Sequence, residues 1–244
     1  MSDRLEGKVC IITGTGGSMG RAAALMFAAQ GAKVVGCDIN REAAQATVDE
    51  VLSLGGDMVS LSECDLTDTR QCKLLVDLAV STWGRIDVLV NSAGHGPRAP
   101  ILDISDDDWH KGLDTYLLNV VRAVRIVTPI MQKQRSGSII NISTAWAFEP
   151  SEMFPTSAVF RAGLASYTKI FADTYAKDNI RINNILPGWI DSLPATDARR
   201  ESVPMQRYGK SEEIAATVAF LASDGAGYIT GQNIRVDGGI TRSI

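Results

Sequence analysis

A chain of 244 residues is long enough to bury a sizeable core and is a common length for one α/β domain. Its net charge of −4 gives no basic field for a phosphate backbone, so nucleic-acid binding is not expected. No apolar run approaches the roughly 18 residues that a membrane helix needs, and Met1 to Lys8 are polar, unlike a secretory leader. We therefore expect one domain over residues 1–244, in the cytoplasm and without membrane contact.

The cysteines give no sign of a metal site. Four are present, without a CxxC pair and without metal-like clustering with histidine. Cys10, Cys37 and Cys64 lie in or beside apolar runs, which predicts buried, reduced thiols, and the fourth is Cys72. We expect no bound metal.

Strand and helix patterns alternate along the whole chain. In chain order we expect strand 8–13, helix 19–30, strand 33–37, helix 41–54, strand 58–63, helix 69–82, strand 86–90, helix 106–134, strand 138–142, helix 154–176, strand 181–186, helix 211–222 and strand 233–236. This alternation is typical of a parallel sheet with helices on both faces. The sequence predicts an α/β Rossmann fold in a single domain, with a doubly wound seven-stranded parallel sheet.

Two helices carry recognisable start signals. Ser105, followed by Asp108, and Ser211, followed by Glu213, resemble N-caps with acidic first turns. Residues 189–205 are polar with scattered prolines, which favours a mobile flap beside a pocket.

The clearest functional motif follows the first strand. Thr13-Gly14-Thr15-Gly16-Gly17-Ser18-Met19-Gly20 leads directly into an alanine-rich helix. Amides at a helix start face a pyrophosphate in this context, so the turn indicates a dinucleotide site. Asp38 ends the second strand, where a carboxylate accepts hydrogen bonds from ribose hydroxyls and repels a 2′-phosphate. These features favour NAD(H) over NADP(H).

The chain resembles the short-chain dehydrogenase/reductase family over essentially its whole length. The family's TGxxxGxG turn is matched except at its middle glycine, where Ser18 could crowd the pyrophosphate or hydrogen-bond to it. Asp65-Leu66 matches the family's adenine contact, although Asp65 could instead cap a helix near Thr67. Asn91-Ser92-Ala93-Gly94 matches the family's NNAG.

The resemblance continues towards the end of the chain. Pro187-Gly188-Trp189-Ile190 matches the family's nicotinamide turn, and Ser192 stands where relatives often have threonine. The resemblance therefore implies these cofactor-binding residues: Gly14, Ser18, Met19, Gly20, Asp38, Asp65, Leu66, Asn91, Ala93, Gly94, Arg161, Pro187, Gly188, Ile190 and Ser192.

The family's catalytic positions carry different residues here. In the family, lysine lowers the phenol pKa of a tyrosine from about 10, serine holds the substrate oxygen and asparagine supports a proton-relay water. Gapless matching places Thr144 at the serine position, Ser157 at the tyrosine position, Arg161 at the lysine position and Tyr116 at the asparagine position. The resemblance implies that all four positions are substituted.

Each substitution has a chemical consequence. Thr144 keeps a hydroxyl, and Arg161 keeps a positive charge but cannot pass a proton on. Ser157 has an alkyl hydroxyl, which is a far weaker acid than a phenol. One hypothesis is that the phenol has moved to Tyr116, with Arg161 stabilising its phenolate. The alternative is that Tyr116 fills the space vacated by the smaller Ser157.

Other side chains could also take part in proton transfer. Glu149 and Glu152, after the fifth strand, and His95 and Arg98, after the fourth, lie on loops where such folds bind ligands, although each could be a solvated loop residue. Asn119 could replace the relay asparagine, but it lies on a shifted helix face. Tyr167 lies almost three turns beyond the tyrosine position and is a poor substitute.

The leading interpretation is an NAD(H)-dependent oxidoreductase with a remodelled site, acting on a small carbonyl, alcohol or imine-like substrate. The alternatives are a non-catalytic NAD-binding protein, either a sensor or a partner subunit, and non-redox chemistry on the same scaffold. The resemblance also implies a homotetramer or homodimer.

Overall fold

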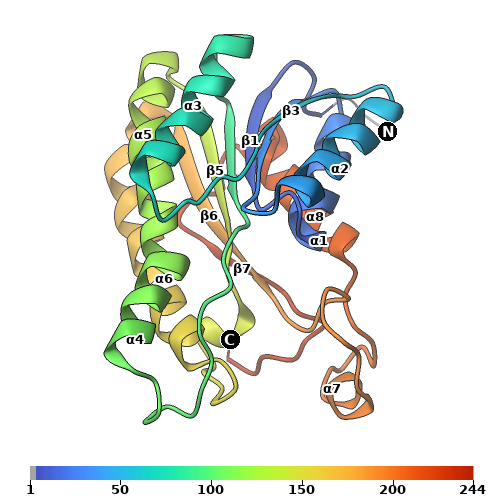
Figure 1. Ribbon diagram of the computed structural model, residues 1–244, viewed down its shortest axis with the longest axis vertical. Coiled ribbons are helices and arrows are strands. Elements are labelled where there is room, and N and C mark those ends of the chain that lie inside the picture. Colours follow the sequence, from blue (N-terminus) through green and yellow to red (C-terminus); the bar gives the residue numbers. More distant parts are fainter. Residues whose placement is uncertain (1–3, 244) are drawn as a thin grey trace.

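The computed structural model describes residues 4–243, so Met1, Ser2, Asp3 and Ile244 lie outside it. Within that range, seven parallel strands form one sheet, and helices cover both of its faces (Figure 1). The strand order is β3-β2-β1-β4-β5-β6-β7. The strands are β1 (Val9–Thr13), β2 (Lys33–Cys37), β3 (Asp57–Leu61), β4 (Val88–Asn91), β5 (Gly137–Ile142), β6 (Ile180–Pro187) and β7 (Asn233–Val236). The expected Rossmann-type fold is confirmed.

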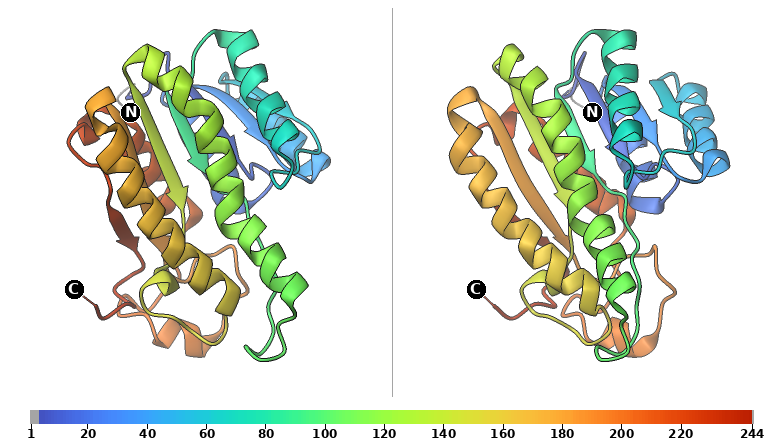
Figure 2. Two further views of the ribbon diagram at one scale, coloured as in Figure 1. Left: turned by 90° about the vertical axis from the view of Figure 1, so that its left-hand side faces the viewer. Right: turned by 60° about the vertical axis from the view of Figure 1, so that its left-hand side comes forward.

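The helices form two layers (Figures 1 and 2). The first part of the chain contributes α1 (Ser18–Ala28), α2 (Arg41–Ser53), α3 (Thr69–Trp83), α4 (Asp106–Leu113), η1 (Asp114–Leu118) and α5 (Asn119–Gln134). The second part contributes η2 (Ala145–Ala147), α6 (Pro155–Tyr175), η3 (Ala176–Asp178), α7 (Asp197–Glu201), α8 (Ser211–Ala222) and η4 (Asp224–Ala226). One buried cluster joins α1, α2 and α8 to the sheet, and a second joins α3, α5 and α6 to its other face.

The sequences of the strands are largely apolar because helices cover both faces of the sheet. All five residues of β1 and all six of β5 are buried. From β1 to β3, successive strands are added at one edge of the sheet, and from β4 to β7 they are added at the other edge. The strand order therefore reverses between β1 and β4, which are neighbours in the sheet. In folds of this kind, ligands bind beyond the carboxyl ends of the strands at such a switch point.

Most expected element ends agree with the structure within two residues, and the long helix predicted for 106–134 is the main difference. It is broken into α4, a π-helical segment η1 and α5. A π-helical segment inserts an extra residue per turn, which apolar periodicity does not reveal. Tyr116 is the buried residue of η1, and its hydroxyl contacts Gly96 in the loop after β4.

The two expected N-caps have different outcomes. The Ser105 hydroxyl accepts the Asp108 amide hydrogen bond at 3.1 Å, as the sequence predicts. Ser211 is instead the first residue of α8, after Lys210 as N-cap. Its hydroxyl donates to Asp191 Oδ1 at 2.7 Å, because the chain preceding α8 folds back against it.

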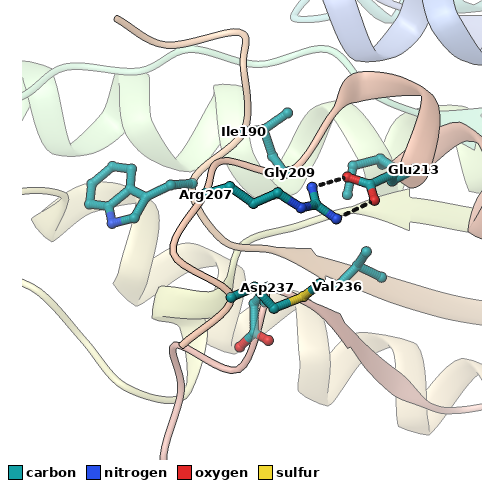
Figure 3. A pocket seen from close by; sticks show the side chains of 10 residues that line it. Ile190, Arg207, Gly209, Glu213, Val236 and Asp237 are labelled. Atoms are coloured by element: carbon teal, nitrogen blue, oxygen red, sulfur yellow. Dashed lines mark hydrogen bonds and ion pairs between the residues drawn. The ribbon is translucent and has the colours of Figure 1, made fainter. Parts of the chain in front are cut away.

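The segment 189–205 is attached to the body of the protein near both of its ends. Trp189 and Val203 are buried in one small cluster. Just beyond the segment, Arg207 forms a two-pronged ion pair with Glu213 of α8, with both N–O distances 2.7 Å (Figure 3). This pair borders a cavity of about 120 Å³, whose wall also includes Trp189, Ile190 and residues 236–238. Arg207 and Glu213 are paired with each other, which indicates a structural anchor.

Two further features bear on the sequence-based expectations. Cys10, Cys37, Cys64 and Cys72 are buried free thiols. Burial raises the pKa of the Cys72 thiol to about 11. Among residues 4–243, no helix is both long and apolar enough to cross a bilayer.

Candidate active site

The turn between β1 and α1 is closed by glycines that no other residue could replace without movement. Gly14 has φ of +71°, in the left-handed region. A Cβ placed on Gly20 would lie 2.1 Å from the Gly14 carbonyl oxygen, so the first turn of α1 packs directly on the loop. Within the described chain no side chain caps the start of α1, which leaves its first amides facing the crevice.

Asp38 holds a fixed position at the end of β2. Its Oδ2 accepts the Gly16 amide hydrogen bond at 2.9 Å, and its Oδ1 accepts that of Asn40 at 2.9 Å. The carboxylate therefore ties the glycine turn to β2. Each oxygen keeps a further lone pair for a ribose hydroxyl.

A cavity of about 540 Å³ extends from this carboxylate and is called here the Asp38 cavity. Its wall includes six of the residues expected at the cofactor: Gly14, Asp38, Asp65, Leu66, Ala93 and Gly94. Asp65 Oδ1 accepts hydrogen bonds from the Thr67 amide and hydroxyl at 2.9 and 2.8 Å. One oxygen of Asp65 thus stabilises a local turn and does not cap a helix, and the residue also borders the cavity. The N-cap of α3 is Asp68.

The loop after β4 is held against β1 by one hydroxyl. Thr13 Oγ1 accepts hydrogen bonds from the amides of Ser92 and Ala93 at 3.0 and 3.2 Å. Asn119 Nδ2 donates to the Ala93 carbonyl at 3.1 Å. Asn119 therefore positions this loop and borders the Asp38 cavity.

Asn91 lies within the sheet and borders neither the Asp38 cavity nor the second cavity of the site, which is described below. Its Nδ2 donates to Asn141 Oδ1 at 2.8 Å, and Asn141 Nδ2 donates to Asn184 Oδ1 at 2.9 Å. Asn184 Nδ2 then donates to Asn233 Oδ1 at 2.7 Å. These four asparagines stand opposite one another on β4, β5, β6 and β7. This asparagine ladder fixes the register of the strands just below the site.

A second cavity, of about 330 Å³, contains the four positions that the family resemblance assigns to catalysis. Tyr116, Thr144, Ser157 and Arg161 all line it, and it is called here the Tyr116 cavity. The remaining expected cofactor residues Ser18, Met19, Gly20, Pro187, Gly188, Ile190 and Ser192 line it as well. Gly14, Gly17, Ser92, Gly94 and His95 border both cavities, so the two adjoin along one wall.

Tyr116 and Arg161 lie against each other. The Arg161 guanidinium carbon is 5.0 Å from the centroid of the Tyr116 ring. Tyr116 Oη accepts the Gly96 amide hydrogen bond at 2.7 Å, and Arg161 donates to the Ile142 carbonyl. Burial lowers the pKa of Arg161 to about 10, while Tyr116 acts in the opposite direction. The guanidinium therefore remains charged at neutral pH.

The other candidates divide into two groups. His95 and Arg98 line the Tyr116 cavity. Glu149 accepts hydrogen bonds from the amides of Arg242 and Ser243 at the C-terminal end, and neither Glu149 nor Glu152 lines this cavity. Tyr167 packs against Phe171 of α6, where burial raises its pKa to about 12.

The sequence reasoning missed several residues of the cavity wall, among them Ser143, Trp146 and Phe154. Ser143 is buried, and its hydroxyl has no hydrogen-bond partner among the described residues. Trp146 and Phe154 form an aromatic wall, with ring centroids 5.3 Å apart. The sequence could have indicated Ser143 and Trp146, since both closely follow the carboxyl end of a buried strand, where such folds bind ligands.

Comparisons with known proteins find relatives along nearly the whole chain. A family model described as Enoyl-(Acyl carrier protein) reductase matches residues 14–241. The chain is 39% identical over 244 residues to 3-oxoacyl-(acyl-carrier-protein) reductase FabG of Thermotoga maritima, covering 97% of this chain and 99% of that protein. It is 34% identical over 244 residues to 7alpha-hydroxysteroid dehydrogenase of Escherichia coli K12, covering 97% and 95%.

A solved structure gives the same picture. It is 7 alpha-hydroxysteroid dehydrogenase complexed with NADH and 7-oxo glycochenodeoxycholic acid, and it matches with a TM-score of 0.91 at 33% identity, covering 98% of this chain and 96% of that chain. Full-length matches at this identity, together with the family model, establish common ancestry as well as fold. The chain belongs to the short-chain dehydrogenase/reductase family.

Proposed function

We propose that the protein is an NAD(H)-dependent oxidoreductase acting on a small carbonyl, alcohol or imine-like compound. The observation that carries this proposal is the shared wall between the Asp38 cavity and the Tyr116 cavity. One extended ligand could occupy both, with its adenosine at Asp38 and its reacting end beside Tyr116. The NADH complex of the 33% identical relative supports the choice of ligand.

The glycine turn fits the pyrophosphate of such a ligand. Gly14 and Gly17 border both cavities, and a Cβ on Gly17 would meet only the Gly14 carbonyl oxygen, at 3.4 Å. The uncapped amides at the start of α1 would bind the phosphates, and exposed Ser18 could add its hydroxyl. When bound, the nicotinamide supplies or accepts the hydride.

Asp38 favours NAD(H) over NADP(H) in this proposal. Its carboxylate is held by two backbone amides and cannot turn away from a 2′-phosphate without losing both hydrogen bonds. The repulsion would therefore be retained in the complex. Two ribose hydroxyls could instead donate to its free lone pairs.

Tyr116 is the proposed proton donor for the substrate oxygen. Because the Gly96 amide donates to its Oη, the phenol's own hydrogen remains free to be given to another acceptor. After proton transfer, the Gly96 amide and the Arg161 charge would both stabilise the oxygen anion. Thr144 and Ser157 would hold the substrate oxygen through their hydroxyls.

The first experiment is a titration of the protein with NADH and NADPH, followed by assays of NADH oxidation with carbonyl and imine compounds. Binding of NADH with measurable turnover is expected. Binding without turnover of any compound would instead favour a non-catalytic NAD-binding role, and binding of neither nucleotide would contradict both.

The role of Tyr116 is tested by Tyr116→Phe. We expect turnover to fall about 100-fold or more, with NADH affinity unchanged, because the proposed proton donor is lost while the ring stays in place. Tyr167→Phe is the matched control, since Tyr167 lies outside the cavity wall. Retained turnover in Tyr116→Phe would mean that Tyr116 only fills space.

A further inference from the structure

The charges on the wall of the Tyr116 cavity are of one sign. Arg161, Arg98 and His95 line it, and no aspartate or glutamate occurs among its described lining residues. Partial desolvation of the imidazole, together with Arg98 and Arg161, lowers the pKa of His95, so the fixed charge at neutral pH comes from the two arginines. An otherwise uncompensated positive field inside a cavity attracts an anionic ligand.

Arg98 is the arginine with the greater capacity for a new partner. It is exposed, and its guanidinium carbon lies 4.7 Å from the centroid of the Phe154 ring. Within residues 4–243 it takes part in no ion pair with a carboxylate, whereas Arg161 already donates to the Ile142 carbonyl. A guanidinium presents five N–H donors in a planar fork that matches a carboxylate.

The surroundings of Arg98 define the rest of the ligand. Phe154 is buried beneath it and packs against Trp146, and both rings face the same cavity. An apolar or aromatic body would pack on these rings, while an acidic group at its end reached Arg98. Tyr116, Thr144 and Ser157 line the same cavity and would meet a carbonyl carried elsewhere on that body.

We infer that this site takes an organic acid, in which a carboxylate binds Arg98 and an apolar body carries the reacting carbonyl to Tyr116. The position of the reacting carbonyl rests on the proposed function, but the carboxylate site at Arg98 does not. Reduction would convert one keto acid, one NADH and one proton into one hydroxy acid and one NAD⁺, with the carboxylate unchanged.

Matched pairs of compounds test the carboxylate site. The probes are 4-oxo-4-phenylbutanoate, 3-oxo-3-phenylpropanoate and 5-oxo-5-phenylpentanoate, each compared with its primary amide by calorimetry. Titrations use the free protein and the protein with NAD⁺, which prevents reduction during the measurement. We expect at least one carboxylate to bind about tenfold or more tightly than its amide, because charge-assisted hydrogen bonds are stronger than neutral ones.

Variants assign that preference to Arg98. Arg98→Gln should make acid and amide bind equally, and Arg98→Lys should restore part of the preference because the charge is retained. Arg199→Gln is the control: Arg199 also lies over an aromatic ring, that of Trp189 at 4.5 Å, but it does not line the cavity. The Arg199→Gln protein should prefer carboxylates over amides to the same extent as the unmodified protein.

The outcomes separate this inference from the proposed function. Equal affinity for every acid and its amide, absence of binding by all the probes, or an unchanged preference in Arg98→Gln would overturn the carboxylate site. A preference that depends on Arg98, without NADH oxidation by any of the three acids, would support the site and count against the hydride-transfer proposal. NADH oxidation without a preference for acids would support the hydride-transfer proposal and overturn the carboxylate site.

Discussion

Among single residues, Asp38 carries the proposed preference for NAD(H), which can be measured directly. We expect Asp38→Ala to weaken NADH binding and to strengthen NADPH binding, because both the ribose acceptor and the repulsion of the 2′-phosphate are removed. A charge-assisted hydrogen bond is worth about 1.5–3 kcal/mol, so the affinity for NADH should fall by roughly 10- to 100-fold. Fluorescence titration with the two nucleotides measures both effects. An unchanged ratio of affinities would show that Asp38 does not select the cofactor.

The sequence identified most of the candidate site residues one by one, but it did not give their contacts. The glycine turn and Asp38 could be recognised as candidates because each directly follows an apolar strand in the sequence. The packing of Arg161 on Tyr116 joins residues on α6 and η1, and it depends on how those two helices meet. The exclusion of Asn91 from both cavities depends in the same way on its partner Asn141 in β5.

At the scale of elements, the asparagine ladder is expected to stabilise the sheet. Asn141 is fully buried and hydrogen-bonds Asn91, Asn184 and Thr168. Asn141→Leu leaves the buried Asn91 Nδ2 without its acceptor and removes one hydrogen bond each from Asn184 and Thr168, which still bond each other, so the free energy of unfolding should fall by about 3 kcal/mol. Urea unfolding measures this. Gln45→Leu on the exposed side of α2 serves as control and should change stability by about 0.5 kcal/mol or less. A similarly small change in Asn141→Leu would contradict a stabilising ladder.

The Arg207–Glu213 pair gives a pH-dependent contribution at the start of α8. Arg207 and the Lys210 amide lower the pKa of Glu213 to about 2. Because the folded pKa lies below the unfolded one of about 4.3, the contribution is present above that unfolded value. It is lost as pH falls toward 2 through the folded pKa. Both side chains are more than a third exposed, so it amounts to about 1 kcal/mol or less.

A variant makes this contribution visible. Glu213→Gln should lower the melting temperature by about 1–4 °C at neutral pH, and the difference from the unmodified protein should disappear in strong acid. Thermal unfolding followed by circular dichroism across this pH range measures it. Glu212→Gln, in the same first turn but without this ion pair, is the matched control. A difference that persists unchanged in acid would exclude the ion pair as its cause.

At the scale of the whole molecule, the proposed cofactor site joins both halves of the sheet, so ligand binding should stabilise the protein as a unit. NADH at about one hundred times its dissociation constant should add about 2.7 kcal/mol to the free energy of unfolding. For a chain of this length that corresponds to a rise in melting temperature of roughly 5–10 °C. Differential scanning calorimetry with NADH and NADPH measures the effect. An equal rise at equal concentrations of both would contradict the proposed preference.

The amino-acid sequence was sufficient to predict the alternation of strands and helices, the glycine turn after β1 and the acidic residue after β2. These features depend on hydrophobic periodicity and on backbone conformations that neighbouring residues impose. The tertiary structure alone decided the π-helical break in 106–134, the asparagine ladder, the placement of Ser211 and the convergence of Tyr116, Arg161, Arg98 and Phe154 on one cavity. Those features arise from packing between segments far apart in the chain, which no local pattern records.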